Sequence, residues 1–458
     1  MINISDYKNI HCIGIGGIGL SAIAEILLAR GYNVTGSDMS ESDITEKLKK
    51  DGAIIYKGHR SENVEGTDLV VYSAAIAEEN PEMQRAKELG IPTAGRAEVL
   101  GTLMDEFRES IAISGTHGKT TTTSMVSLIL EHAGLDPTIL IGGKLEEIGG
   151  NVKVGKSDYF VTEACEYRDS FLQLRPDIEI ILNIDSDHLD YFKDIDHIVK
   201  SFRKFASSMQ NGGKLIAYGA NPFVDSILKD FPEAITFGYG TNYTYSIENV
   251  KFEDNGMPSF EIIYDGENLG RIEMSVPGEH NILNATAAFA CCHQLGVDPQ
   301  IIARTLSGFT GTDRRFDLVG KTKKGFTVVD DYAHHPTEIK ATLSAADKLP
   351  HNKLWCIFQP HTYTRTLALF DQFAPAFAKA DVLIVTDIYA AREKNIYSIT
   401  SESLADNFKK NFPDKTIMYM SDFDDIADYV AENAEEGDLV ITMGAGHVYK
   451  VGNMIMER

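Results

Sequence analysis

The chain has 458 residues, which is too long for one hydrophobic core and favours about three domains. It carries 43 Lys and Arg against 67 Asp and Glu, and the net charge of −24 argues against a broad surface for nucleic acid or for an anionic membrane. Five scattered cysteines, a polar start and no apolar run near ~18 residues predict neither a disulfide framework nor a signal peptide, so we expect a cytoplasmic protein.

The first segment predicts a βαβ unit of the dinucleotide-binding type. A short strand at 10–13 leads into Gly14-Ile-Gly16-Gly17-Ile-Gly19, a helical pattern follows at 20–28, and a second strand ends at Asp38. This is the G-x-G-x-x-G pattern with an acid about 20 residues further on. We expect the loop to hold a diphosphate and Asp38 to lie near a ribose. On this motif alone, a nicotinamide cofactor remains an alternative.

Alternation of strands and helices continues beyond this unit. A strand is expected at 68–73 and a short helical run at 96–103, which predicts a parallel, doubly wound sheet. The polar stretch at 105–110 then marks a boundary. We therefore expect a first domain at 1–108.

An apolar run at 111–113 breaks into Gly115-Thr-His-Gly118-Lys119-Thr-Thr121, which predicts a nucleotide triphosphate site. Glycine N–H groups can surround phosphate oxygens, Lys119 supplies a charge to the terminal phosphates, and Thr120 or Thr121 offers a hydroxyl to Mg²⁺. A helix that begins near Thr120 would direct its positive end at the same anion. The position five before Gly118 is Ile113 rather than glycine, so the loop is a shortened variant. A plain glycine turn before a capped helix is the alternative.

The middle segment predicts a mixed sheet. Strands are expected at 159–163, 178–184 and 213–217, antiparallel strands between 235 and 274, and an alanine-rich helix at 282–295. A second boundary near 308–315 gives a central domain at 109–312 and a last domain at 313–458.

Acids follow two strands of this segment. Glu163 ends one strand, and Asn183-Ile-Asp-Ser-Asp-His188-Leu-Asp190 follows the next. Because the carboxyl ends of parallel strands form a ligand-binding edge, we expect Thr120, Glu163 and His188 to lie around Mg²⁺, with Mn²⁺ as an alternative ion. In the alternative interpretation His188 only orients a loop. Glu166 is left open between a site residue and a solvated charge.

Polar clusters also follow the strands of the last segment. Strands are expected at 326–329, 354–358, 382–385 and 439–442. Asp330-Asp331-Tyr332-Ala-His334-His335-Pro336 follows the first strand, and Gln359-Pro-His361-Thr-Tyr-Thr-Arg365 follows the second. We expect both loops at the same edge of the sheet, where they would form another ligand-binding edge. Adjacent histidines point in different directions, so they are not expected to bind one metal ion together.

In this order, the motifs resemble those of the Mur ligase family over nearly the whole chain. The matching pieces are Gly14-Ile-Gly-Gly-Ile-Gly19, Gly36-Ser-Asp38, Gly115-Thr-His-Gly-Lys-Thr-Thr121, Asn183-Ile-Asp-Ser-Asp-His188, Pro277-Gly-Glu-His-Asn281, Asn284-Ala-Thr286, Arg314-Arg315-Phe-Asp317, Asp330-Asp-Tyr-Ala-His-His-Pro336, Gln359-Pro-His361 and Gly444-Ala-Gly446. The resemblance implies an α/β protein of three domains. These are a Rossmann-like amino-terminal domain for uridine diphosphate, a central P-loop ATPase domain with a mixed sheet, and a Rossmann-like carboxy-terminal domain that closes over ATP and an amino acid.

The resemblance also implies an activity in peptidoglycan precursor synthesis. In the branch that the motifs resemble most, ATP phosphorylates the lactyl carboxylate of UDP-N-acetylmuramate to an acyl phosphate, the amine of L-alanine attacks, and phosphate leaves. UDP-N-acetylmuramate, L-alanine and ATP would be the partners of the chain, with no nucleic acid and no membrane insertion, and it would act as a monomer or homodimer. The protein would contribute positioning and charge neutralisation.

Site residues follow from the same resemblance. It implies catalytic roles for Lys119, Glu163, His188, His334 and Arg365, and metal ligation by Thr120, Glu163 and His188. It implies ATP binding by Gly115, Thr116, His117, Gly118, Lys119, Thr120, Thr121, His280, Asn284, Arg315 and Asp331. It implies UDP-sugar binding by Gly14, Gly16, Gly17, Gly19, Asp38, Ser73 and Arg96, and amino-acid binding by Tyr332, His334 and Arg365.

One position departs from the family pattern. Many members have arginine after Gln-Pro-His, where this chain has Thr362. Another branch carries threonine there together with an Ala-Arg-Glu triplet, as at Ala391-Arg392-Glu393, so we interpret Thr362 as a subfamily difference.

Two kinds of alternative remain. A member that attaches an intact L-Ala-γ-D-Glu-diaminopimelate peptide to UDP-N-acetylmuramate shares the Tyr-Ala-His-His-Pro piece, although the intact first glycine loop favours the L-alanine branch. From other classes, a non-catalytic nucleotide-binding module or a dehydrogenase would each account for part of the pattern. The joint presence of Lys119, Glu163 and His188 argues against both.

Overall fold

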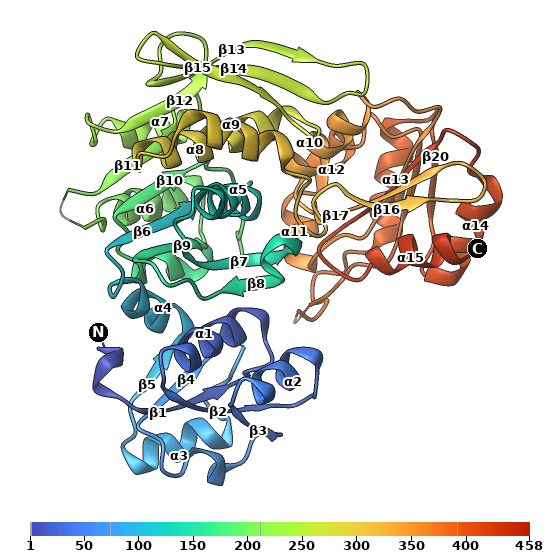
Figure 1. The fold of residues 1–458 in the computed structure, drawn as a ribbon. Coiled ribbons are helices and arrows are strands. Elements are labelled where there is room, and N and C mark those ends of the chain that lie inside the picture. The colour runs from blue at the N-terminus through green and yellow to red at the C-terminus, as the bar shows by residue number, and fades with distance from the viewer. Residues whose placement is uncertain (1, 74, 211, 392) are drawn as a thin grey trace.

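The protein is described by a computed structural model that covers residues 2–73, 75–210, 212–391 and 393–458. Figure 1 shows three α/β units in chain order, with the blue amino-terminal unit below the green and yellow central unit and the orange-to-red unit beside the central one. Each unit has its own sheet. The predicted three-domain α/β fold is confirmed, and 1–108, 109–312 and 313–458 remain our proposed domain limits.

The amino-terminal sheet is parallel, with the strand order β3-β2-β1-β4-β5. Its strands are β1 (Asn9–Ile13), β2 (Asn33–Asp38), β3 (Ile54–Lys57), β4 (Leu69–Tyr72) and β5 (Thr93–Gly95). Its helices are α1 (Ile18–Ala29), α2 (Asp43–Lys50), α3 (Pro81–Leu89) and α4 (Arg96–Met104), with 3-10 turns η1 (Ile4–Asp6) and η2 (Ser61–Val64). The order reverses between β1 and β4, so the loops after these strands diverge at the edge where such sheets bind ligands.

The central sheet has ten strands in the order β15-β14-β13-β12-β11-β10-β6-β9-β7-β8. They are β6 (Glu109–Ser114), β7 (Thr138–Leu145), β8 (Gly150–Lys153), β9 (Tyr159–Glu163), β10 (Ile178–Ile181), β11 (Lys214–Tyr218), β12 (Ile235–Tyr239), β13 (Tyr245–Phe252), β14 (Pro258–Tyr264) and β15 (Glu267–Glu273). The run from β13 to β7 is parallel, whereas β14, β15 and β8 pair antiparallel. The sheet is therefore mixed, as predicted.

Two expectations about this sheet were wrong in detail. We expected antiparallel strands from 235 onward, but β12 pairs in parallel with both β11 and β13, and helix α7 (Pro222–Leu228) makes the crossover between β11 and β12. We expected one strand to run to 184, but β10 ends at Ile181. Beyond it, Leu182 donates to the Ser114 carbonyl and the Asn183 carbonyl accepts from Thr116, so this backbone supports the phosphate loop instead.

Helices cover both faces of the central sheet. On one face lie α5 (Lys119–His132), α8 (Glu279–Gln294) and α9 (Pro299–Gly308), packed on a core of aliphatic strand residues. On the other lie α6 (Ile195–Ala206), α7 and the 3-10 segment η4 (Tyr167–Gln173), packed through phenylalanines. The short 3-10 turn η3 (Glu146–Ile148) joins β7 to β8. Helix α8 is rich in alanine and buried along most of its length, and this lets it lie against α5 (Figure 1).

The carboxy-terminal sheet has the order β16-β17-β21-β18-β19-β20, and only β16 is antiparallel. Its strands are β16 (Asp317–Lys321), β17 (Thr327–Asp331), β18 (Leu354–Phe358), β19 (Val382–Val385), β20 (Thr416–Tyr419) and β21 (Leu439–Met443). Its helices are α10 (Pro336–Ala346), α11 (Tyr363–Ala368), α12 (Phe370–Ala376), α13 (Ser401–Asn411), α14 (Phe423–Asn433) and α15 (Tyr449–Glu457). Because β17 and β18 run parallel on either side of β21, the loops after them share one edge, as predicted.

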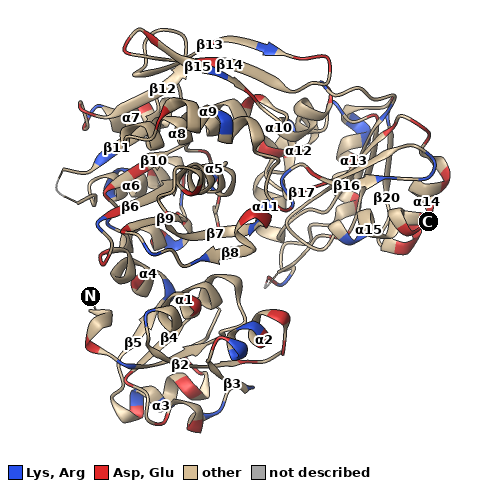
Figure 2. Cartoon of the chain, in the orientation of Figure 1, with Lys and Arg blue, Asp and Glu red and all other residues tan. Residues whose placement is uncertain are grey.

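Among the described residues, no helix combines the length and apolarity needed to cross a membrane. Lys and Arg positions are scattered among Asp and Glu positions in all three domains (Figure 2).

Candidate functional site

The phosphate loop lies between β6 and α5. Gly115 and Gly118 have φ values of 135° and 89°, which favour glycine, and Gly118 is the N-cap of α5. A Cβ added at Gly118 would lie 2.5 Å from Asn284 Oδ1, so the loop backbone lies against α8. Asn183 fixes the loop, because it accepts from the His117 N–H at 2.9 Å and donates to the His117 carbonyl at 3.0 Å. The sequence motif contained Asn183, but we had given it no role.

Lys119 lies over this loop with its ammonium group nearly enclosed. Nζ donates to the carbonyls of Gly115 and Thr116, the latter at 3.1 Å, and lies 2.9 Å from Glu166 Oε2. Burial disfavours the charged ammonium, but the Glu166 carboxylate outweighs it and holds the pKa of Lys119 above its ordinary value. Glu166 is itself buried, and within the described ranges its Oε1 has no hydrogen-bond partner. Glu166 is therefore part of the site rather than a solvated charge.

Thr120 and Glu163 meet beside β7. A Cβ added at Gly142 would lie 2.9 Å from both carboxylate oxygens of Glu163, and a Cβ added at Gly143 would lie 3.2 Å from Thr120 Cγ2. Glu163 Oε1 also accepts from the Gly142 N–H at 2.7 Å. A hydroxyl and a carboxylate in one glycine-lined corner, next to a phosphate loop, are the hard oxygen donors that Mg²⁺ prefers.

The contacts of His188 are with other residues. It has a left-handed φ of 53°, and its ring packs on Tyr167 with 4.7 Å between the centroids. In the part of the chain that the structure describes, no hydrogen bond or ion pair joins His188 to Thr120 or Glu163. The metal role of His188 therefore stays a prediction.

A cluster of histidines and carboxylates connects the phosphate loop to the carboxy-terminal domain. His117 Nε2 lies 3.2 Å from Asp185 Oδ2, and its Nδ1 lies 3.2 Å from Glu338 Oε1. Asp185 also accepts from Thr337 Oγ1 at 2.6 Å and lies 3.9 Å from His335 Nδ1. Burial opposes protonation of His117, but the two carboxylates raise its pKa to about 9. The protonated ring therefore holds the two domains together.

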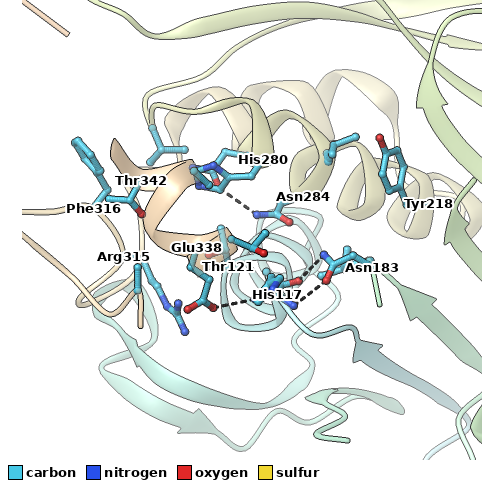
Figure 3. A pocket seen from close by; sticks show the side chains of 18 of the residues that line it. His117, Thr121, Asn183, Tyr218, His280, Asn284, Arg315, Phe316, Glu338 and Thr342 are labelled. Carbon is cyan, nitrogen blue, oxygen red and sulfur yellow. Dashed lines mark hydrogen bonds and ion pairs between the residues drawn. The ribbon is translucent and has the colours of Figure 1, made fainter. Parts of the chain in front are cut away.

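A first cavity has a volume of about 370 Å³ and lies between the phosphate loop, α8 and α10 (Figure 3). The predicted ATP residues that line it are His117, Gly118, Thr121, His280, Asn284, Arg315 and Asp331. Tyr218, Phe237 and Leu283 add an apolar wall suited to a purine ring. Burial lowers the pKa of His280 to about 4, so its ring is neutral near pH 7.

The adjacent residues Arg314 and Arg315 have different surroundings. Arg314 is held by the fold, because its Nε lies 2.9 Å from Asp330 Oδ2 and its NH2 donates to the Gly444 carbonyl at 2.7 Å. Arg315 instead lines the first cavity, with its guanidinium 5.0 Å from the centre of the Tyr332 ring. The ATP role of Arg315 stays a prediction, and Arg315 lies where that role requires.

The second cavity, of about 750 Å³, lies between segment 186–190 and the loops after β18 and β19. The predicted residue Arg365 lines it, and so does Thr362, which has a φ of 61° and caps α11. His334 is nearby, with its ring 5.3 Å from that of His361 and 5.6 Å from that of Tyr332. The residues predicted for the amino acid are thus brought together, while Arg392 lies outside the described residues.

Arg365 forms an ion pair with Asp187 in the wall of this cavity. Its Nε and NH2 donate to Asp187 Oδ1 at 3.0 Å and 2.9 Å. Asp187, to which we had given no role, is nearly buried, and this ion pair joins the central and carboxy-terminal domains.

The predicted UDP-sugar residues gather where β1 and β4 end: Gly14, Gly16, Gly17, Gly19, Asp38, Ser73 and Arg96. Asp38 Oδ2 accepts from the Gly16 N–H at 2.9 Å, and a Cβ added at Gly19 would lie 3.3 Å from Arg96 Nε. The loop therefore brings backbone N–H groups, an acid and a guanidinium to one edge, a combination that suits a nucleoside diphosphate.

Comparison with protein families gives three matches that together cover most of the chain. A model described as "Mur ligase family, catalytic domain" matches residues 9–108, "Mur ligase middle domain" matches 113–292, and "Mur ligase, glutamate ligase domain" matches 314–446.

Named relatives match over the full length. The UDP-N-acetylmuramate–L-alanine ligase of Alkaliphilus metalliredigens is 52% identical over 98% of this chain and 97% of its own. The protein of the same name from Acetivibrio thermocellus is 50% identical over 100% of this chain and 97% of its own.

Solved structures agree with this. The UDP-N-acetylmuramate-alanine ligase of Thermotoga maritima superposes with a TM-score of 0.82 at 29% identity, over 99% of both chains. A murein peptide ligase from Psychrobacter arcticus superposes with a TM-score of 0.72 at 26% identity, over 98% of both chains.

Proposed function

The chain belongs to the Mur ligase family, and we propose that it joins L-alanine to the lactyl carboxylate of UDP-N-acetylmuramate, with ATP as co-substrate. Relatives with this printed activity are about half identical to it from end to end. The product would be a peptidoglycan precursor.

One observation carries the proposal on the structural side. The backbone that follows β10 lines both cavities: 182–185 borders the first and 186–190 borders the second. A triphosphate in the first cavity, with its terminal phosphate near Lys119, would therefore lie one loop away from an acceptor in the second. Phosphoryl transfer requires this adjacency of donor and acceptor.

The first chemical step makes the carboxylate reactive. A lactyl carboxylate oxygen attacks the γ-phosphorus of ATP, the bond to the β,γ-bridging oxygen breaks, and ADP leaves. Lys119 and the loop N–H groups neutralise charge on the transferred phosphoryl group, while Arg315 and His280 hold the nucleotide. The resulting acyl phosphate has a good leaving group, which a free carboxylate lacks.

The second step forms the amide. The uncharged amine of L-alanine attacks the acyl carbon, and the C–O bond to phosphate then breaks. The amine gives up a proton to the departing phosphate or to solvent as the amide forms. Tyr332, His334 and Arg365 are our candidates for orienting the amino acid, and the Arg365–Asp187 pair keeps the carboxy-terminal loops over the reacting groups.

Magnesium fits the corner formed by Thr120 and Glu163, and His188 is the proposed further ligand. The ion would neutralise negative charge on the transferring phosphates. We place the reaction in the cytoplasm, and the five cysteines, all free thiols, suit a reducing compartment. The enzyme is expected to act as a monomer or homodimer.

Phosphate release tests the proposal directly. The enzyme is incubated with ATP, Mg²⁺ and UDP-N-acetylmuramate, and L-alanine is compared with the L-Ala-γ-D-Glu-diaminopimelate tripeptide. Release that depends on L-alanine supports the proposal. Release only with the tripeptide would assign the peptide-attaching activity instead, and no release with either would refute both.

A further inference from the structure

The Gln-Pro-His motif after β18 holds one residue that the proposed mechanism does not use. Gln359 has a structural role, because its Oε1 accepts from the His447 and Val448 N–H groups at 2.7 Å and 3.2 Å. His361 differs: it is only half-buried, and its side chain lines the second cavity. Its ring is stacked on Tyr389 with 5.8 Å between the centroids, which fixes the ring plane.

The chemistry of its neighbour fixes the tautomer of His361. Arg365 NH1 lies 2.7 Å from His361 Nδ1. A guanidinium has donors only, so Nδ1 must be the acceptor and must carry no proton. Burial, together with His334 and Arg365, lowers the pKa of His361 to about 3, so the ring is neutral near pH 7. The single ring proton therefore resides on Nε2.

This Nε2–H is a donor without a protein acceptor. Among the described residues, no hydrogen bond to His361 Nε2 is formed, and the atom is not sealed from the cavity. The carboxylates that line the same cavity are already engaged. Asp187 Oδ1 binds Arg365, and Asp190 Oδ2 accepts from the Tyr167 hydroxyl at 2.9 Å. Glu393 accepts from the N–H of Thr364 at 2.9 Å and from its hydroxyl. A donor thus faces the cavity, and none of the described carboxylates accepts from it.

We propose that His361 donates its Nε2–H to the carboxylate of the incoming amino acid and so determines the affinity for L-alanine. The inference rests on the proposed function. It adds to that function a binding residue, with a fixed tautomer, that the site had not included.

The position of His361 selects this carboxylate over the lactyl one. The lactyl carboxylate must approach the terminal phosphate, which the Lys119 loop of the central domain holds. Tyr167 and His188 form the central-domain wall of the cavity. This wall is the one nearer to Lys119, because Tyr167 directly follows Glu166 and Glu166 binds Lys119. His361 lies on the opposite wall, from the carboxy-terminal domain. L-alanine, which carries the attacking amine and its own carboxylate, is therefore the substrate that we expect beside the carboxy-terminal wall.

Two substitutions separate the two ring nitrogens. In His361→Asn the side-chain oxygen takes the place of Nδ1 and still accepts from Arg365, but the Nε2–H is lost. In His361→Gln the longer side chain returns an N–H to the Nε2 position. The measurements are KM for L-alanine, KM for ATP, kcat and Tm of the full-length enzyme, with wild type in the same assay.

The expected result is a KM for L-alanine about 10- to 100-fold higher in H361N, the range for a lost hydrogen bond to a charged group. The KM for ATP, kcat and Tm should stay near the wild-type values, and H361Q should recover a large part of the affinity. An L-alanine KM within about twofold of wild type in H361N would overturn the inference, and so would a rise that H361Q shares in full. No L-alanine-dependent release from the wild type would remove the proposed function itself, which is a different outcome.

Discussion

Arg365 of the carboxy-terminal domain donates two N–H groups to one oxygen of Asp187 in the central domain, at 3.0 Å and 2.9 Å. Both side chains are about nine-tenths buried. The pair lies in the wall of the second cavity, so it links closure of the two domains to the place where the amino acid is expected.

We therefore predict that Asp187→Asn lowers kcat/KM for L-alanine by about 100-fold, because removal of one partner leaves the other charge buried and unpaired at a cost of roughly 3 kcal/mol or more. Small-angle scattering in the presence of substrates should show a larger radius of gyration for the variant. Asp196→Asn, an exposed acid in the following helix, is the control. Unchanged kinetics and scattering in the Asp187 variant would refute the closure role.

Lys119 carries the second prediction. Lys119→Ala should lower kcat by a factor of about 10² to 10³ or more, because the transferred phosphoryl group loses its nearest charge. It should also lower Tm, since Glu166 is then a buried carboxylate without its cation. Addition of Glu166→Gln should restore Tm but not activity. Normal turnover in Lys119→Ala would contradict the phosphate-loop assignment.

Gly118 provides a test of the ATP site with a matched control. Gly118→Ala places a Cβ 2.5 Å from Asn284 Oδ1, whereas Gly134→Ala, at a φ of 75°, meets nothing within 4 Å. Both substitutions strain a left-handed backbone by about 1 kcal/mol, and Gly118→Ala must also displace Asn284, so its Tm should fall further than that of the control. Only Gly118→Ala should weaken ATP binding, by at least about tenfold. Equal ATP affinities, measured by calorimetry, would exclude the predicted approach of nucleotide to this loop.

Magnesium dependence tests the corner beside β7. Chelation with EDTA should abolish phosphate release, and Glu163→Gln should raise the Mg²⁺ concentration needed for half-maximal rate by about tenfold or more, since an anionic ligand is lost. The exposed Glu146→Gln is the control. If Glu163→Gln and the control respond alike to Mg²⁺, the ligand is elsewhere.

The raised pKa of His117 leads to a prediction of how the stability of the folded protein depends on pH. Its pKa is about 9 in the folded protein against an ordinary value of 6.5, because Asp185 and Glu338 outweigh the effect of burial. Since the folded value is raised, the stabilisation is fully present below about pH 6.5 and is lost as the pH rises through about 9. It amounts to at most about 3 kcal/mol.

Calorimetric Tm measured at pH 6.5, 8 and 9.5 should therefore fall in this window for the wild type. The fall should be shallower in His117→Gln, which cannot gain the proton. The same pH slope in both proteins would show that the stability of the domain contact does not depend on His117.

The local sequence pattern was sufficient to predict those parts of the site that lie in the loop after a single strand. Gly118 and Lys119 are placed by a strand, a glycine turn and a helix start, all within a few residues, and the structure has them as predicted. The amino-terminal loop with Asp38 was predictable for the same reason. In the first case the chemistry lies in consecutive residues, and in the second it lies within one βαβ unit, since Asp38 is 19 positions beyond Gly19.

Contacts between domains could not be predicted in this way. His117 and Glu338 are 221 positions apart, and Arg365 and Asp187 are 178 apart, so each pair depends on how two separately folded domains meet. Arg365 was expected to hold the amino acid, and nothing in its sequence context indicated that an acid of the central domain engages it. The orientation of β12 was wrong for another reason, because it pairs in parallel with its sequence neighbours β11 and β13, and an alternating pattern does not distinguish parallel from antiparallel pairing.

Transfer of oxygen from the lactyl carboxylate to phosphate tests the central claim most directly. UDP-N-acetylmuramate labelled with ¹⁸O in the lactyl carboxylate is incubated with the enzyme, ATP, Mg²⁺ and L-alanine, and the released phosphate is analysed by mass spectrometry. An acyl phosphate requires one labelled oxygen in each phosphate released. Phosphate without label, formed together with the alanine amide, would contradict the account.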